Sequence, residues 1–150
     1  MRIAALLAIA LLLLGCLGEG NGDWGGEPDT AKVQLPDGKI VDCEIRDTQA
    51  GREEGLMGHD SLCGSCGMLF VFESPGRHGF WMKSMKFPID IVFIDEGWKV
   101  VGIAQDVLPC LGEPCTTYYP DSNAMYVLEL PANATSGHGI GVGSGITRLG

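Results

Sequence analysis

Positive charge is scarce in this sequence. Lys and Arg together number 10 against 19 Asp and Glu among 150 residues, so the formal net charge is −9. A surface with this balance repels the phosphates of nucleic acids and anionic headgroups. We therefore expect no nucleic-acid partner.

The sequence also lacks the short motifs of several large enzyme classes. It contains no nucleophile elbow, no H-E-x-x-H zinc motif, no phosphate loop and no dinucleotide fingerprint. The glycines of residues 139–145 lack the preceding strand and following helix that would make them a phosphate cradle. No catalytic residue is predicted from a motif, and a non-enzymatic role is favoured.

No apolar run is long enough to cross a bilayer as a helix, which takes about 20 residues. Residues 4–14 form an apolar run of eleven after Arg2, and Leu13-Leu14-Gly15-Cys16 has the form of a lipobox. This order is typical of a lipoprotein signal peptide. We expect residues 1–15 to be removed and a lipid on Cys16 to anchor the protein to the extracytoplasmic face of the cell membrane. The alternative is an ordinary secretory signal in which Cys16 is incidental.

The remaining chain is long enough for one domain. Loss of residues 1–15 removes one positive charge, Arg2, and changes the formal net charge from −9 to −10. Residues 16–31 are rich in Gly and acidic residues and poor in β-branched ones, which predicts a flexible tether. Residues 32–150 are predicted to form a single compact domain.

The apolar pattern of the domain predicts mainly strands. Pro36-Asp37-Gly38 is typical of a hairpin turn, and Thr48 can cap one short helix over residues 48–57. Aromatic and β-branched segments separated by Gly or Pro predict further strands. The expected strands are residues 31–35, 39–46, 67–73, 80–83, 89–94, 98–107, 125–130 and 145–149.

These elements predict an α+β, β-rich fold, in which a mostly antiparallel sheet is curled or barrel-like and carries one short helix. Residues 89–94 are apolar at odd and even positions alike, except for Asp90. A strand of this kind is buried on both faces, so we place it centrally in the sheet.

The order of these segments resembles the family called domain of unknown function 192, also called uncharacterised protein family 0127. The likeness covers residues 32–149. The resemblance implies a compact β-rich domain that is frequently exported, and it brings no assigned activity. The residues that carry it are Gly55-Leu56-Met57, Gly67-Met68-Leu69-Phe70-Val71-Phe72, Phe80-Trp81-Met82-Lys83, Pro88-Ile89-Asp90-Ile91, Phe93-Ile94-Asp95, Pro109-Cys110, Cys115, Tyr118 and Tyr126-Val127-Leu128-Glu129-Leu130.

Apart from Cys16, the sequence contains five cysteines, and all of them lie in the predicted domain. In an oxidising exterior we expect two local disulfides, Cys63 with Cys66 and Cys110 with Cys115, and Cys43 buried in a strand. Two alternatives stay open: Cys63 and Cys66 as a redox-active pair, or the four spaced cysteines as a tetrahedral zinc site. No cofactor is otherwise predicted.

Lys83, Asp90 and Glu129 each stand within an apolar segment. A buried charge without a partner costs several kcal/mol, so these groups should meet a partner. One possibility is a structural network of buried ion pairs. Another is a cleft in which Trp81 offers a flat face and the charges orient a polar ligand, with His59 as a further candidate. A hydrolase that uses Asp90 and Glu129 as acid and base is a third possibility.

Asn133-Ala134-Thr135 fits the acceptor pattern for N-glycosylation in a loop. Taken together, the sequence favours a lipid-anchored extracytoplasmic module that binds a small polar ligand or a partner protein. Metal or thiol redox chemistry at the cysteines and carboxylate-dependent hydrolysis are the alternatives.

Overall fold

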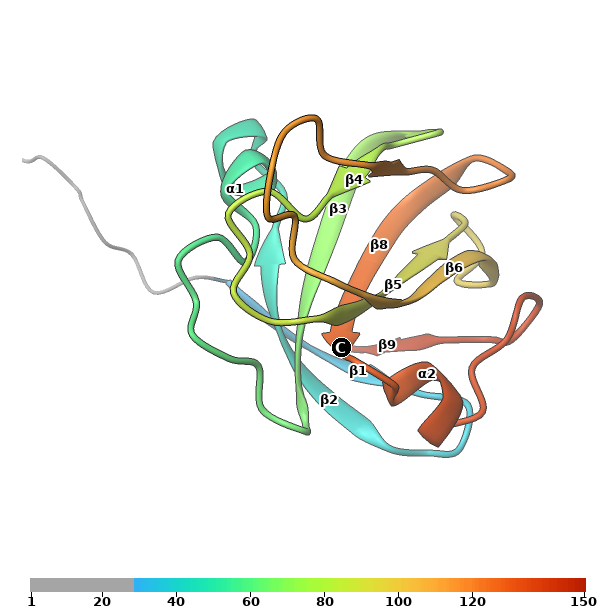
Figure 1. The fold of residues 1–150 in the computed structure, drawn as a ribbon. Coiled ribbons are helices and arrows are strands. Elements are labelled where there is room, and N and C mark those ends of the chain that lie inside the picture. Colours follow the sequence, from blue (N-terminus) through green and yellow to red (C-terminus); the bar gives the residue numbers. More distant parts are fainter. Residues whose placement is uncertain (1–28) are drawn as a thin grey trace, which may run out of the picture.

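A computed structural model describes residues 29–150 (Figure 1). The predicted signal peptide, Cys16 and nearly all of the predicted tether lie outside the described residues. The first strand begins at Thr30, so the last two residues assigned to the tether belong to the domain. No helix in residues 29–150 is both long and apolar enough to pass through a membrane.

Seven strands form one sheet, and a two-stranded ribbon lies beside it. The sheet order is β6-β5-β8-β3-β2-β1-β9, and the ribbon pairs β4 with β7. The strands are β1 (Thr30–Gln34), β2 (Ile40–Arg46), β3 (Cys66–Gly76), β4 (Phe80–Trp81), β5 (Ile89–Ile94), β6 (Val100–Val107), β7 (Thr117–Tyr118), β8 (Ala124–Pro131) and β9 (Thr147–Leu149).

The sheet is mixed but mostly antiparallel. Only the β2–β3 pair is parallel among the named strand pairs of the described chain. The two ends of the sheet approach each other at one isolated bridge, between Lys99 and Gly145. No strand ladder in residues 29–150 closes the sheet, so the expected curl is present but a barrel is not.

Residues 29–150 contain two short helices, where one was predicted. Helix α1 (Gln49–Glu54) begins after Thr48, whose side chain accepts a hydrogen bond from the Gly51 backbone N–H at 3.1 Å. It ends at Gly55, which has a positive φ of 50°, so it is shorter than the predicted 48–57. Helix α2 (Ala134–Gly137) and the two-residue strand β7 were not predicted, because elements this short carry no periodic pattern.

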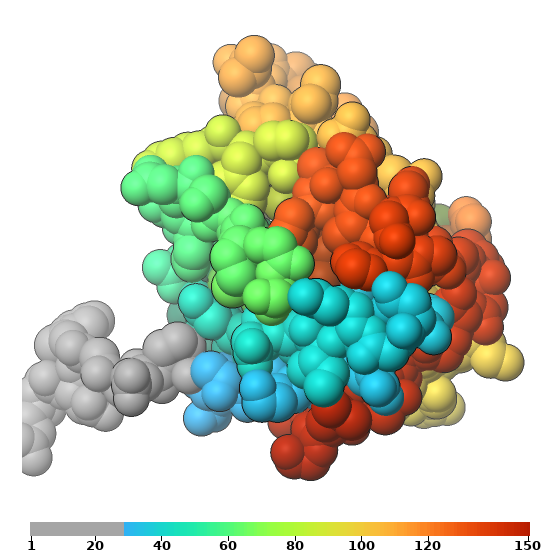
Figure 2. All heavy atoms as spheres, turned by 90° about the horizontal axis from the view of Figure 1, so that it is seen from below, coloured from blue at the N-terminus to red at the C-terminus, as the bar shows by residue number. Residues whose placement is uncertain are grey.

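The predicted hairpin at the start of the domain is confirmed. The Leu35 N–H donates to the Lys39 carbonyl at 2.8 Å, and Gly38 has a φ of 89° that glycine adopts without strain. In the space-filling view from below, the blue and cyan atoms of β1 and β2 lie beside the orange and red atoms around α2 (Figure 2). One contact between these regions is the pair of His138 Nδ1 and Asp37 Oδ2, which lie 2.7 Å apart.

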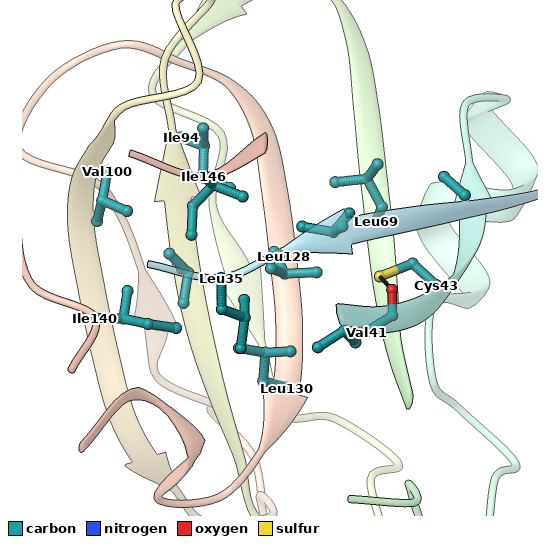
Figure 3. Close-up of a cluster of buried hydrophobic side chains, with 13 residues drawn as sticks. Leu35, Val41, Cys43, Leu69, Ile94, Val100, Leu128, Leu130, Ile140 and Ile146 are labelled. Carbon is teal, nitrogen blue, oxygen red and sulfur yellow. Dashed lines mark hydrogen bonds between the residues drawn. The ribbon is translucent and has the colours of Figure 1, made fainter. Parts of the chain in front are cut away.

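Each face of the sheet covers its own hydrophobic core. The first core lies inside the curl and is drawn in Figure 3, where side chains of β1, β2, β3, β5, β6 and β8 meet Ile140 and Ile146 from the C-terminal segment. The second core lies on the opposite face. Its buried members are Leu56, Met68, Phe70, Met82, Ile89, Ile91, Phe93, Val107, Ala124 and Val127.

Strand β5 is fully buried along its length, as its apolar pattern predicts. It lies between β6 and β8, second from one end of the sheet rather than in the middle. The burial comes from the two cores, because Val92 and Ile94 face the first and Ile91 and Phe93 face the second. Burial on both faces therefore did not require the central position.

Candidate functional site

Three of the five predicted ligand-binding residues line one cleft. Trp81, Lys83 and Glu129 share this cleft, whereas Asp90 and His59 do not border it. The cleft has a volume of about 320 Å³ and lies where α1, β3, β4 and β8 meet. Figure 1 shows α1 and β4 at the same end of the molecule.

The wall of the cleft is largely apolar and aromatic. The Phe80 ring packs edge-on against Phe70, with ring centroids 4.8 Å apart and an interplanar angle of 88°. Phe72 stacks on His78, with centroids 3.6 Å apart. The apolar lining residues are Leu56, Met57, Phe70, Phe72, Phe80, Trp81 and Met85, and the ionisable ones are Arg52, Glu53, Glu54, His78, Lys83 and Glu129.

Glu129 is the buried polar group of this cleft. Only 5% of its surface is exposed, and its Oε2 has no hydrogen-bond partner in the described chain. Its register neighbours on the adjacent strands are Met68 and Ile91, both apolar and fully buried. Because burial penalises the ionised form, the pKa of Glu129 rises to about 8. Near neutral pH the wall of the cleft therefore holds a protonated carboxyl group.

The two cationic side chains of the cleft have other partners. Lys83 Nζ lies 2.7 Å from Glu113 Oε1, and Lys83 is half exposed. Arg52 donates to the backbone carbonyls of Val71, at 2.9 Å, and Asp47. Neither neutralises Glu129, so the predicted buried ion-pair network of Lys83, Asp90 and Glu129 is wrong.

Trp81 stands at the mouth of the cleft. Its side chain is 55% exposed, and Lys83 Nζ lies 5.7 Å from the centre of the indole ring. Strand β4 holds it through its pairing with β7, where Trp81 lies opposite Thr117. The Cys110–Cys115 disulfide closes the loop before β7, and Cys110 donates its backbone N–H to the carbonyl of Met82, which follows β4, at 3.0 Å.

Asp90 is buried on the other face of the sheet. It lies opposite Leu130 in the register, whereas Glu129 lies opposite Ile91, so the two carboxyl groups point to opposite faces. Asp90 accepts hydrogen bonds from the backbone N–H groups of Asp106 (2.7 Å), Asn133 (3.1 Å) and Thr135 (2.8 Å), and from the Thr135 hydroxyl (2.5 Å). These contacts make it a structural anchor. A hydrolase that uses Asp90 and Glu129 together is inconsistent with this geometry.

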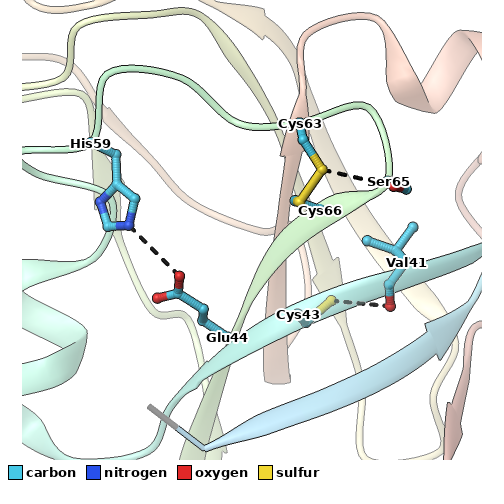
Figure 4. The surroundings of a disulfide bond; sticks show 7 residues. All are labelled: Val41, Cys43, Glu44, His59, Cys63, Ser65 and Cys66. Carbon is cyan, nitrogen blue, oxygen red and sulfur yellow. Dashed lines mark hydrogen bonds and ion pairs between the residues drawn. A yellow bond between two sulfur atoms is a disulfide. The ribbon is translucent and has the colours of Figure 1, made fainter. Parts of the chain in front are cut away.

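His59 borders a second cavity of about 420 Å³, which also includes Cys43, Cys63 and Cys66. Its Nε2 lies 3.9 Å from Glu44 Oε1, as Figure 4 shows. Leu56 is the residue common to the two cavities, and His59 does not border the cleft that holds Glu129.

The cysteines pair as the disulfide hypothesis predicts. Cys63 bonds to Cys66 and Cys110 bonds to Cys115, with S–S distances of 2.06 and 2.10 Å. The four thiolates of the alternative zinc site are therefore not available, and no cluster of potential metal ligands occurs in residues 29–150. Cys43 is buried, and burial raises the pKa of its thiol to about 12, which makes it unreactive at neutral pH.

The predicted glycosylation acceptor, Asn133, is exposed at the start of α2 and has a left-handed φ of 66°. Thr135 of the same tripeptide is fully buried, and its hydroxyl donates to Asp90. Modification of Asn133 stays a prediction.

Sequence reasoning did not identify the contribution of α1 to the cleft. The residues around this helix that line the cleft are Gln49, Arg52, Glu53, Glu54, Gly55, Leu56 and Met57. The available signal was Gly55-Leu56-Met57 within the family pattern, next to a pair of acidic residues. Nothing in the linear order places that segment beside Trp81 or Glu129.

Two solved structures are similar to this chain. A protein from Sinorhizobium meliloti 1021, described as a proposed transcription regulator, is 25% identical with a TM-score of 0.75, covering 83% of this chain and 98% of its own. A protein of unknown function from Novosphingobium aromaticivorans DSM 12444 is 26% identical with a TM-score of 0.71, covering 80% and 84% respectively. No curated protein matches the chain. Residues 32–148 match the family DUF192, described as "Uncharacterized ACR", and the chain belongs to this family.

Proposed function

We propose that this protein is a binding module for a small molecule that occupies the cleft between α1, β3, β4 and β8. The observation that carries the proposal is the unpartnered Oε2 of Glu129, which is buried at the wall of this cleft beside the apolar side chains of Met68 and Ile91. A buried polar atom without a partner costs about 1–3 kcal/mol, and such groups are concentrated at functional sites. A ligand that bonds to this carboxyl group would recover that free energy.

The remaining walls suit a ligand with an apolar body. Leu56, Phe70, Phe80 and Met85 would contact that body, while Trp81 and Lys83 lie where its solvent-facing end would emerge. A volume of about 320 Å³ is within the range of small-molecule sites, which begin at about 300 Å³. The enclosed carboxyl group favours a small molecule over a protein surface, because a protein reaches such a group only with an inserted side chain.

We further propose that the domain works outside the cytoplasm, on a lipid attached to Cys16. The lipobox and the apolar run before it support this location, and the two disulfides are typical of an oxidising compartment. The membrane is then a partner through the lipid, and the unknown ligand is a second partner.

Direct DNA binding is not part of the proposal, although one similar structure is described as a proposed transcription regulator. The net charge of −9 opposes contact with phosphates.

The proposal is tested by a fragment screen followed in methyl NMR spectra of the domain. The screen contains cationic, neutral and anionic aromatic fragments. We expect at least one fragment to shift the methyl resonances of Leu56, Met57 and Met85, which line the cleft. We expect Trp81→Ala to weaken that fragment by roughly tenfold with little change in melting temperature, because the indole is half exposed.

The matched control is Val142→Ala, which removes an exposed apolar side chain that does not border the cleft. This variant should bind the fragment as the unmodified domain does. If no fragment of any charge shifts the cleft methyl groups, the proposed binding function is wrong.

A further inference from the structure

We propose that the ligand of this cleft is an organic cation, with an apolar body and an amidinium, guanidinium or ammonium group that pairs with the Glu129 carboxylate. This inference rests on the binding function proposed above and names the chemical class that the site takes. The observation that supports this inference is the placement of charged groups around Glu129.

Within residues 29–150, the buried carboxyl group of Glu129 lacks both a hydrogen-bond donor and an opposite charge. Both of its register neighbours, Met68 and Ile91, are apolar, and no described side chain donates a hydrogen bond to its Oε2. The other buried carboxyl group among the described residues, Asp90, accepts four hydrogen bonds. A cationic group with N–H donors would supply both missing elements, a hydrogen bond and an opposite charge.

Ionisable groups face the cleft from several surrounding elements. From α1, Arg52 is bonded to backbone carbonyls, Glu53 accepts from the Gln49 amide at 3.0 Å, and Glu54 is exposed. On the opposite wall, His78 Nε2 contacts the Ser74 carbonyl at 3.1 Å and Lys83 pairs with Glu113.

Lys83 is paired with Glu113, and Arg52 donates to two backbone carbonyls and lies 3.9 Å from Glu73, whereas Glu129 and Glu54 have no hydrogen bond among the described residues. An anionic ligand would compete with Glu113 for Lys83 and with Glu73 for Arg52, and it would lie beside Glu129 and Glu54. The overall negative charge of the protein acts in the same direction, because it raises the local concentration of cations.

Aromatic side chains form part of the cleft wall. Phe70, Phe80 and Trp81 border the same space as Glu129. Aromatic faces attract cations through their quadrupole, more strongly where water is excluded. The combination of one buried carboxyl group with three aromatic rings matches a flat cation attached to an apolar body.

Binding of a cation is coupled to loss of a proton. Burial raises the pKa of Glu129 to about 8, so the empty site holds the neutral acid at pH 6. When the cation enters, the O–H bond of Glu129 breaks, the proton leaves to solvent, and the carboxylate pairs with the cation. Charge and atoms balance without any further reactant. Affinity for a permanent cation must then rise with pH until Glu129 is ionised in the empty site.

The test uses benzamidine, benzamide and benzoate, which are a cation, a neutral molecule and an anion of nearly the same shape. Isothermal titration calorimetry measures each one on the purified domain at pH 6, 7 and 8, in buffers of different ionisation enthalpy. We expect benzamidine to bind at least tenfold more tightly than the other two at pH 8. Its affinity should rise about tenfold from pH 6 to pH 7, with release of about one proton at pH 6.

Two variants separate Glu129 from the rest of the protein. Glu129→Gln should remove both the preference for benzamidine and the dependence on pH. Glu96→Gln, which changes an exposed carboxyl group outside the cleft, should keep both, because that group does not release the proton. The proton count in the unmodified domain provides the same answer if Glu129→Gln does not fold.

Two results overturn the inference. Tighter binding of benzamide, with affinity that falls as pH rises, means that the protonated acid recognises a neutral carbonyl group. Absence of benzamidine binding while neutral or anionic fragments shift the cleft methyl groups likewise excludes a cation. Both results leave the binding function intact, whereas a failed fragment screen removes the binding function itself.

Discussion

Glu129 and Asp90 lie on paired strands, and their surroundings give them different roles. Asp90 receives three backbone N–H groups and one hydroxyl, which replace the water that it loses on burial. Glu129 receives none at its Oε2 and faces a cavity instead. The first arrangement stabilises the fold, whereas the second leaves a group that a ligand can satisfy.

At the residue scale, Glu129 should make the stability of the empty domain depend on pH. The folded-state pKa of about 8 lies above the ordinary value of 4.5, so the folded state holds the proton more tightly than the unfolded state between these values. The free energy of unfolding should therefore fall as pH rises from 5 to 8, by about 1.4 kcal/mol per pH unit from this group. Glu129→Gln should remove that slope in urea titrations.

The exposed carboxyl group of Glu96 provides the control, since Glu96→Gln changes the same atoms outside the core. Its slope should match that of the unmodified domain. Equal slopes for all three proteins would mean that Glu129 is ionised in the folded state at neutral pH.

At the scale of secondary-structure elements, helix α2 and the β4–β7 ribbon are held in place by the rest of the fold rather than by their own hydrogen bonds. The four-residue helix α2 has no side-chain cap from Asn133. Instead, Asp90 on β5 accepts the backbone N–H groups of Asn133 and Thr135 at its start. The ribbon of β4 and β7 is similarly held by the loop before β7, where Cys110 bridges to Lys83 after β4 and is disulfide-bonded to Cys115. Both elements are too short to persist alone.

Asp90→Asn should detach α2 from the sheet. The amide offers one acceptor oxygen in place of two and turns an NH₂ group toward N–H donors, so we expect a loss of about 3 kcal/mol in the free energy of unfolding. Hydrogen exchange of the α2 amides should become faster. Fragment binding in the cleft should persist, because Asp90 points to the opposite face.

Asp121→Asn, at an exposed position, serves as the control and should leave both measurements unchanged. If Asp90→Asn loses fragment binding while the α2 amides still exchange slowly, Asp90 contributes to the ligand site after all.

At the scale of the whole molecule, we propose that an acidic domain is anchored through the lipobox-like sequence Leu13-Leu14-Gly15-Cys16. Two acyl chains on Cys16 would give stable membrane attachment, whereas one chain binds only marginally. The domain would then act on molecules near the outer surface of the membrane, and its negative charge would keep it clear of anionic headgroups.

Cys16→Ala should release the protein from the membrane. We expect the unmodified protein to enter the detergent phase in phase-partition experiments and to incorporate labelled fatty acid, and the variant to do neither. Cys43→Ala, which changes a buried cysteine of the domain, should behave like the unmodified protein. A labelled and membrane-bound Cys16→Ala protein would refute the proposed anchor.

The amino-acid sequence by itself determined most of the strands, the first hairpin, the two local disulfides and the burial of β5. Those features depend on neighbours within a few residues: turn chemistry at Pro36-Asp37-Gly38, alternation along a strand, and cysteines close enough to pair. The same reasoning grouped Trp81, Lys83, Asp90, Glu129 and His59 as ligand-binding candidates. Trp81, Lys83 and Glu129 border one cleft and the other two do not, and a ligand-binding role stays a prediction.

Only the tertiary structure decided which charges meet. Asp90 and Glu129 both stand in apolar strands, and the register of β5 against β8 turns them to opposite faces. The partner of Lys83 is Glu113, which a loop brings near, and α1 reaches the cleft from a distant part of the sequence. Strand pattern specifies which residues are buried, but strand pairing specifies the neighbours with which they are buried, and those neighbours set the charge state of a side chain.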